Sequence, residues 1–192
     1  TSQNIIRDNY IINVGRCIAD KAQHYLLKAF ANTDHKGWKL IIVGDGPLRS
    51  SLEKLANELG VGDKVEFAGF KKNVDAYLAK SKIFAFTSSS EGFPNVIGEA
   101  LSVGLPVVAF NCVAGPSDMI EDGESGFLIP LFDRETFKKK LQRLMEDESL
   151  RVRLGKIALK KISEFESGKI AERFYEFISR KQPAEPEEVE AV

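Results

Sequence analysis

Cysteine and histidine are scarce in this 192-residue chain, which holds two of each. Cys17 and Cys112 stand far apart, with no CxxC pair and no neighbouring histidine, so their spacing predicts neither a zinc site nor a disulfide framework. We expect two reduced, partly buried thiols and a cytoplasmic protein. His24 and His35 have no serine or carboxylate at a catalytic spacing, which gives no support to a hydrolase triad.

Long apolar runs and an excess of charge of one sign are also missing. No run approaches the roughly 20 apolar residues that a membrane-spanning helix needs. The formal net charge is −1, so the composition gives no general attraction to nucleic acid or to an acidic membrane surface. No DxD pair is present that could hold a metal–diphosphate complex, so we expect no metal. Apolar residues make up 43% of the chain, enough for the core of one domain.

Short apolar runs alternate with longer segments of helical period along most of the chain. Six runs read as strands and cover residues 10–15, 38–44, 64–70, 82–90, 105–110 and 126–131. Strands separated by helices predict parallel βαβ units, and continuous Val/Ile/Phe runs suit a sheet that is covered on both faces. The fold class is therefore α/β: a single Rossmann-like, doubly wound parallel sheet of about six strands with helices on both faces, followed by C-terminal helices.

We expect one nucleotide-binding domain over residues 1–180, followed by an acidic tail over residues 181–192. The tail "KQPAEPEEVEAV" has no core pattern and is expected to be disordered. "GPLRSSLEKLANELG" predicts a helix with Pro47 at its first position and Gly60 at its stop. The charged run 134–161 reads as the exposed faces of the C-terminal helices.

In open α/β sheets, ligands bind at the carboxyl ends of the strands, where the strand order reverses. With the common order 3-2-1-4-5-6, the first and fourth strands flank that crevice. The loop after the first strand, "GRCIADK", supplies Gly15, Arg16 and Lys21. The loop after the fourth, "SSSEGFPN", supplies Glu91, Gly92 and a helix that opens at Pro94. The two loops predict a site with cations on one side and an acid and a helix end on the other.

The helix end after the fourth strand suits a phosphate. Backbone N–H groups from Phe93 through Asn95 to Val96 have few partners within the helix and carry part of its positive dipole. Gly92 lets a ligand come close. Glu91 would repel a phosphate, so we expect it to accept from neutral donors such as sugar hydroxyls. Glu99, on the flank of the apolar stripe, would be partly desolvated and would accept from a ribose diol.

Four segments in succession carry a resemblance: "GRCIADK", "IIVGDGPLRSSLEKLANELGVGDKVEFAGF", "SSSEGFPNVIGEALSVGLPVVAF" and "GPSDMIEDGESGFLIP". Together they resemble the C-terminal, donor-binding domain of GT-B, family-4 (group 1) retaining glycosyltransferases, over about residues 10 to 180. The resemblance implies that a hexose or N-acetylhexosamine moves from a nucleotide diphosphate sugar, with UDP favoured. The acceptor would be a glycan or a lipid-linked glycan in bacterial-type surface polysaccharide assembly.

The resemblance also implies roles for residues. Arg16 and Lys21 would hold the diphosphate as a leaving group, beside Gly15. Glu91 would bind the transferred sugar, next to the backbone of residues 92–95. Glu99 would bind the ribose, and Phe70, within residues 69–71, would lie beside the base.

Some features depart from the family pattern. Ala22 stands where glycine or asparagine is common, and Asp118 stands where glutamate is usual. The first strand begins about ten residues from the start, which leaves no room for the N-terminal acceptor domain. We therefore expect a donor half that does not transfer sugar alone, with any attachment to the inner membrane face made through the missing domain.

Other interpretations stay open. Arg16 could be a surface arginine, Lys21 a solvated helix start, and Glu99 an exposed helix acid. Gly44 and Gly46 resemble the start of a GxGxxG fingerprint, but Arg49 occupies the third glycine position and the motif follows the second strand, so a strand-to-helix turn is the better account. Half of a nucleotide-sugar epimerase and a non-catalytic nucleotide-binding module remain alternative functions.

Overall fold

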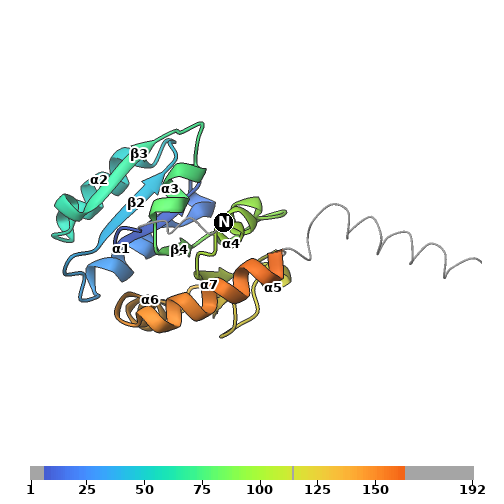
Figure 1. Ribbon diagram of the computed structural model, residues 1–192. Helices are drawn as coiled ribbons and strands as arrows, with labels where there is room; N and C mark the ends of the chain where they lie inside the picture. The colour runs from blue at the N-terminus through green and yellow to red at the C-terminus, as the bar shows by residue number, and fades with distance from the viewer. Residues whose placement is uncertain (1–6, 114, 163–192) are drawn as a thin grey trace, which may run out of the picture.

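A computed structural model describes residues 7–113 and 115–162 of the chain. Its centre is a six-stranded parallel sheet in the order β3-β2-β1-β4-β5-β6 (Figure 1). The strands are β1 (Tyr10–Val14), β2 (Lys39–Val43), β3 (Val65–Gly69), β4 (Ile83–Phe86), β5 (Val107–Asn111) and β6 (Gly126–Pro130). The predicted fold class and strand order are therefore confirmed. Each strand lies within its predicted run, except that β5 extends one residue beyond it, to Asn111.

Helices follow the strands in the alternating pattern that the sequence predicts. They are α1 (Gln23–Ala31), α2 (Arg49–Glu58), α3 (Asp75–Lys80), α4 (Asn95–Ser102), α5 (Pro116–Met119), α6 (Arg134–Glu146) and α7 (Glu148–Ile162), with short 3-10 turns η1 (Ala19–Lys21) and η2 (Gly62–Lys64). The helix predicted to begin at Pro47 begins two residues later, because Pro47 and Leu48 form the turn that precedes it. The tail at residues 181–192 lies outside the described residues.

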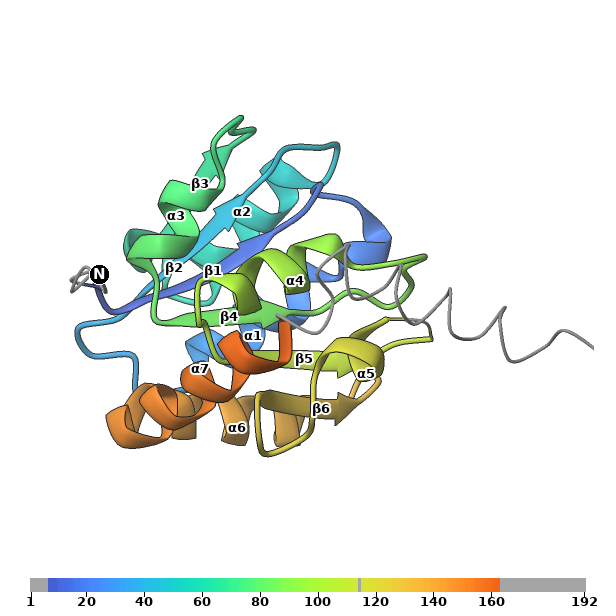
Figure 2. The ribbon, with the colours of Figure 1, turned by 45° about the vertical axis from the view of Figure 1, so that its right-hand side comes forward.

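Successive residues of each strand point to opposite faces of the sheet and therefore enter different hydrophobic cores. Ile11 packs with α1, α2 and α6 on one face, whereas Ile12 packs with α3, α4 and α5 on the other. In Figure 2, α3 and α4 lie in front of the strands and α1 and α2 behind them. Since both faces are covered, the strands are continuously apolar.

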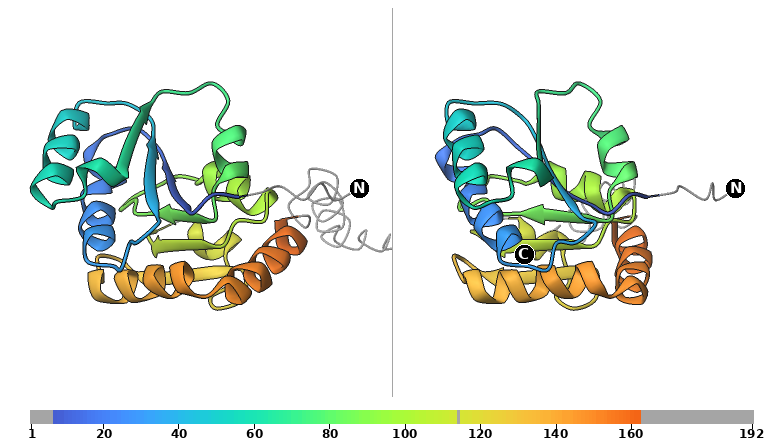
Figure 3. Two further views of the ribbon diagram at one scale, coloured as in Figure 1. Left: turned by 60° about the vertical axis from the view of Figure 1, so that its left-hand side comes forward. Right: turned by 90° about the vertical axis from the view of Figure 1, so that its left-hand side faces the viewer.

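The C-terminal helices close the fold along one side. In Figure 3, α6 and α7 follow one another past the edge of the sheet. Helix α7 reaches the turn before β5, where a Cβ on Gly155 would lie 2.4 Å from the carbonyl oxygen of Gly104. Only glycine allows the helix and that turn to approach so closely. Among the described residues, no helix is both long enough and apolar enough to cross a bilayer.

Candidate functional site

Strands β1 and β4 are hydrogen-bonded neighbours at the point where the strand order reverses. Ile11 pairs with Ile83, and Ile12 with Phe84. Because the two strands are parallel, their carboxyl ends emerge at the same edge. The loops that the sequence assigns to a ligand site therefore start side by side.

Hydrogen bonds join those two loops directly. The N–H of Ser89 donates to the carbonyl of Asp20 at 2.7 Å, and Thr87 Oγ1 donates to the carbonyl of Lys21 at 2.9 Å. At the outer end of the junction, Lys21 Nζ forms an ion pair with Glu91 Oε1. The structure thus brings together a cation and an acid that come from separate predicted loops.

The ion pair differs from the expectation that Glu91 accepts only from neutral groups. Its carboxylate neutralises the charge of Lys21. The two side chains are only 22% and 14% exposed, for Lys21 and Glu91 respectively. Gly15 lies beneath the lysine stem, where a Cβ would come within 3.3 Å of Lys21 Cδ. The absence of a side chain at Gly15 therefore makes room for Lys21 to reach across.

The turn after β2 supports the loop after β1 from behind. The N–H of Cys17 donates to Asp45 at 2.9 Å, and the carbonyl of Cys17 accepts from Leu48 at 3.0 Å. Gly44 has φ +138°, and a Cβ there would lie 2.0 Å from the carbonyl oxygen of Gly15. This contact explains the glycines of "GDGP": they form a strand-to-helix turn packed on the site loop, as the sequence indicates, rather than a dinucleotide fingerprint.

Arg16 is exposed at this edge, and its side chain has no hydrogen-bond or ion-pair partner among the described residues. Its backbone, in contrast, is fixed: the carbonyl of Arg16 accepts from Nε2 of Gln23 at 2.9 Å, and Gln23 is buried. A fixed backbone with an unengaged guanidinium is suited to meeting a ligand from solution.

The segment that leads into α4 presents both space and apolar surface. A Cβ on Gly92 would meet nothing within 4 Å, and Phe93 is 55% exposed. Pro94 is buried and directly precedes α4, so the helix begins at Asn95 rather than at the proline. The N–H of Asn95 bonds to the carbonyl of Phe93 at 3.0 Å, which takes one of the amides expected to be available.

Glu99 and Phe70 are the outlying members of the predicted site. Glu99 is exposed, so the expectation that the helix flank would partly desolvate it is wrong. Val96, one turn before it, is half-buried. Phe70 follows β3 at the same edge and is 74% exposed, an unusual position for an aromatic ring without a partner to cover it.

Several residues that shape the site escaped the sequence analysis. Thr87 and Ser89 tie the loops together, and Gln23 fixes the backbone of Arg16. The polar run at residues 87–90, directly after an apolar strand, is the signal that could have identified the first two. Ala22 adopts the left-handed conformation with φ 47°, which gives a physical reason why glycine or asparagine would suit this position.

The described residues contain no cluster of three or more histidine, cysteine or acidic side chains that could hold a metal ion. Cys112 is buried, and burial together with the nearby charge of Glu91 raises the pKa of its thiol. Four cavities of the described part have other residues in their walls and are not lined by Arg16, Lys21 or Glu91. We call the joined loops after β1 and β4 the ledge.

Comparisons with known proteins agree with this geometry. An exopolysaccharide phosphotransferase of Streptomyces coelicolor is 36% identical over 178 residues, which cover 89% of this chain and 19% of that protein. A diphospho-undecaprenol 4-alpha-N-acetylgalactosaminyltransferase of Campylobacter jejuni is 34% identical over 86% of this chain and 45% of its own length. The chain therefore spans less than half of these curated relatives.

Solved structures contain the same fold. The structure of Anabaena HepE in complex with UDP-glucose superposes with a TM-score of 0.80 and 26% identity, over 92% of this chain and 50% of that one. The chain thus corresponds to half of a GT-B enzyme, the C-terminal half. The family model described as "Glycosyl transferases group 1" matches residues 2–161, and the chain belongs to that family.

Proposed function

We propose that this domain binds a UDP-sugar and is the donor half of a retaining glycosyltransferase of surface-glycan assembly. The sugar would be a hexose or an N-acetylhexosamine, and the acceptor a glycan or a lipid-linked glycan. The UDP-glucose complex of HepE and the lipid-diphosphate substrate named for the Campylobacter relative support these classes. Retention of the anomeric configuration is proposed from the family resemblance.

One observation carries the proposal: the loops after β1 and β4 are fused into a single ledge at the reversal of the strand order. The hydrogen bond from Ser89 to Asp20, at 2.7 Å, and the Lys21–Glu91 pair hold the ledge together. This is the position at which open α/β sheets bind nucleotides.

The charges of the ledge suit a diphosphate leaving group. On donor binding, Lys21 would turn its charge from Glu91 to the diphosphate, and Arg16 would join it from solution. The two cations would then neutralise the charge that develops on the departing diphosphate, an electrostatic effect directed at the transition state. No metal is required for this role, because the cations supply the positive charge.

Glu91, released from Lys21, would accept hydrogen bonds from hydroxyls of the transferred sugar. The open space at Gly92 would admit that sugar against the backbone of residues 92–95, and the amino end of α4, including Val96, would face the diphosphate. Glu99, exposed on α4, would bind the ribose, and the exposed ring of Phe70 would lie beside the base.

Transfer would need a second domain. The chain covers 45% of the Campylobacter transferase, and an acceptor domain of the GT-B kind would face the carboxyl edge of this one. We propose that this domain by itself binds donor and does not transfer sugar. Its place would be the cytoplasm, with peripheral attachment to the inner membrane face through an acceptor domain.

Calorimetry with UDP tests the proposal. Arg16→Ala should weaken UDP binding by about tenfold or more, which corresponds to about 1.4 kcal/mol. Arg153→Ala is the matched control, because Arg153 lies on α7 and pairs with Glu124 at 3.7 Å, away from the ledge. Equal affinities of wild type and Arg16→Ala would refute the diphosphate role.

The alternatives need the full-length protein. An epimerase would convert a UDP-sugar to its epimer without acceptor, whereas a transferase would release UDP only when acceptor is present. A non-catalytic module would do neither. These assays separate the three activities even if this domain binds the same nucleotide in all of them.

A further inference from the structure

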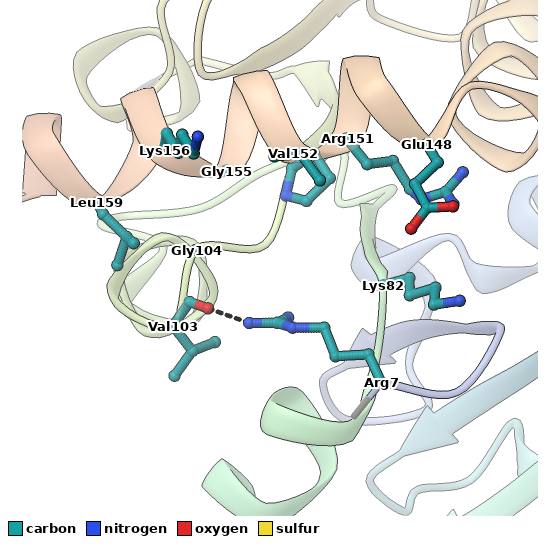
Figure 4. A pocket seen from close by; sticks show the side chains of 11 residues that line it. Arg7, Lys82, Val103, Gly104, Glu148, Arg151, Val152, Gly155, Lys156 and Leu159 are labelled. Carbon is teal, nitrogen blue, oxygen red and sulfur yellow. Dashed lines mark hydrogen bonds between the residues drawn. The ribbon is translucent and has the colours of Figure 1, made fainter. Parts of the chain in front are cut away.

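A cavity of about 650 Å³ lies at the edge of the sheet opposite the ledge (Figure 4). Arg7 precedes β1, Lys82 precedes β4, the turn at residues 103–106 precedes β5, and residues 148–159 of α7 form the remaining wall. Because the strands are parallel, this amino edge is separated from the carboxyl edge by the length of β1, roughly 17 Å at 3.3 Å per residue. The cavity is therefore separate from the donor ledge.

The charges that line this cavity are unbalanced. Of its eleven lining residues, four are cations (Arg7, Lys82, Arg151 and Lys156) and one is an acid, Glu148. Within the described part of the chain, no carboxylate lies within 4.0 Å of any of these four cations. Subtracting the one acid from the four cations leaves a surplus of three positive charges.

Arg7 is held in place without being neutralised. Its Nη1 donates to the carbonyl of Ser81 at 2.8 Å, and its Nη2 donates to the carbonyl of Val103 (Figure 4). These bonds leave other N–H groups of the five on the guanidinium available. Burial lowers the pKa of Arg7, which expresses the cost of placing its charge there without a counter-ion.

Arg151 is fixed in the same manner. Its Nη1 donates to the carbonyl of Leu144 at 2.6 Å, and its guanidinium lies 5.3 Å from the centre of the Trp38 ring. Burial lowers the pKa of Arg151, and the charges of Glu148 and Asp147 oppose this shift without forming an ion pair within 4.0 Å. Lys82 donates to Asn9 at 2.7 Å, again to a neutral oxygen. Arg7, Lys82 and Arg151 are thus hydrogen-bonded to neutral oxygens, which leaves their charges available to an anion.

Apolar surface adjoins these charges. Val152 and Leu159, seven residues apart on α7, are 51% and 47% exposed and both line the cavity. Lys156 lies between them on the same wall (Figure 4). A ligand with both an anionic and an apolar part would therefore meet complementary groups.

We propose that this cavity binds a phosphate group. At pH 7 a phosphate monoester carries about −1.5 to −2 charges and three acceptor oxygens, which match the surplus charge and the remaining arginine N–H groups. Two sources share this chemistry: a soluble phosphate monoester, and the monoester headgroup of phosphatidic acid, whose chains would contact Val152 and Leu159.

Titration of the isotope-labelled 192-residue chain with inorganic phosphate tests the site by amide NMR. The amide resonances of Gly104 and Gly155, on the cavity wall, are expected to shift. Phosphate that binds at the donor ledge would instead shift the amide resonances of Gly15 and Gly92. Lys156→Gln should weaken this binding about threefold, the size expected for one partly exposed charge, whereas Glu148→Gln should tighten it. Lys54→Gln on α2, which also removes one positive charge, is the matched control.

Binding to lipid vesicles distinguishes a soluble phosphate ligand from a lipid headgroup. Binding of inorganic phosphate at the cavity without retention on the anionic vesicles supports the site and a soluble ligand. Retention on phosphatidic acid–phosphatidylcholine vesicles but not on pure phosphatidylcholine, weakened by Lys156→Gln and not by Lys54→Gln, supports the site and a lipid headgroup. The proposal is overturned if neither probe binds, if shifts occur only at the Gly15 edge, or if Lys156→Gln and Lys54→Gln behave alike.

Discussion

Lys21 and Glu91 form an ion pair although 70 positions separate them in the sequence. Lys21 closes the turn after β1, and Glu91 stands in the loop after β4. The pair exists because β4 lies directly beside β1 in the sheet. It links the half of the ledge that carries positive charge to the half that carries the helix end.

The pair should contribute to stability. Both side chains are largely buried, so Glu91→Gln would leave the Lys21 charge without its partner. We expect a loss of about 1–2 kcal/mol in the free energy of unfolding, between the values for exposed and buried pairs. Urea denaturation measures it. The double variant Lys21→Met/Glu91→Gln should lose less than the sum of the two single variants, and strict additivity would contradict the coupling.

Gly44 should tolerate no side chain. A Cβ would lie 2.0 Å from the carbonyl oxygen of Gly15, at φ +138°. Gly44→Ala is expected to cost about 3 kcal/mol or more, from backbone strain and overpacking together. Gly60→Ala is the matched control: Gly60 has φ +73° with nothing within 4 Å, so it should cost only the strain, about 1–2 kcal/mol. Equal costs in thermal unfolding would show that the loops are not packed so tightly.

Gly92, in contrast to Gly44, should tolerate an added side chain. Since a Cβ there meets no protein atom within 4 Å, Gly92→Ala should change the free energy of unfolding by less than about 0.5 kcal/mol. If the donor sugar lies against this backbone, the same change should weaken UDP-glucose more than UDP. Calorimetry with both ligands measures the difference, and an equal effect on both would move the sugar away from Gly92.

Glu99 is assigned to the ribose on the basis of its place on α4. Wild type should bind UDP more tightly than 2′,3′-dideoxy-UDP, because only the former offers hydroxyl donors to the carboxylate. Glu99→Gln should reduce this discrimination. The ratio of the two dissociation constants is the measurement, and an unchanged ratio in the variant would remove the ribose role.

Much of the fold could be predicted because its signals are local. Continuous apolar runs such as 105–110 identify buried strands, and a proline and a glycine mark the limits of α2 and of α4 to within two residues. The strand order followed from a general rule for doubly wound sheets. The rule also placed Arg16 and Glu91 at one edge, and the structure confirms that their loops meet.

The contacts within the ledge could not be predicted in the same way. Sequence reasoning gave Glu91 a neutral partner, because no local pattern says which side chain will lie within reach of a carboxylate 70 positions away. It likewise treated Glu99 as partly desolvated, because a helical stripe shows which face is apolar but not how far a neighbouring element covers its flank. Both outcomes depend on how separate segments pack.

By itself the sequence determined the alternation of strands and helices and the chemical types that follow the first and fourth strands, since periodicity and motif spacing are properties of neighbouring residues. Only the tertiary structure decided which groups meet: Lys21 with Glu91 at one edge of the sheet, and Arg7 with Arg151 and Lys156 around a cavity at the other. Charges and donors act over a few ångströms, so their partners are fixed by packing between segments that lie far apart along the chain.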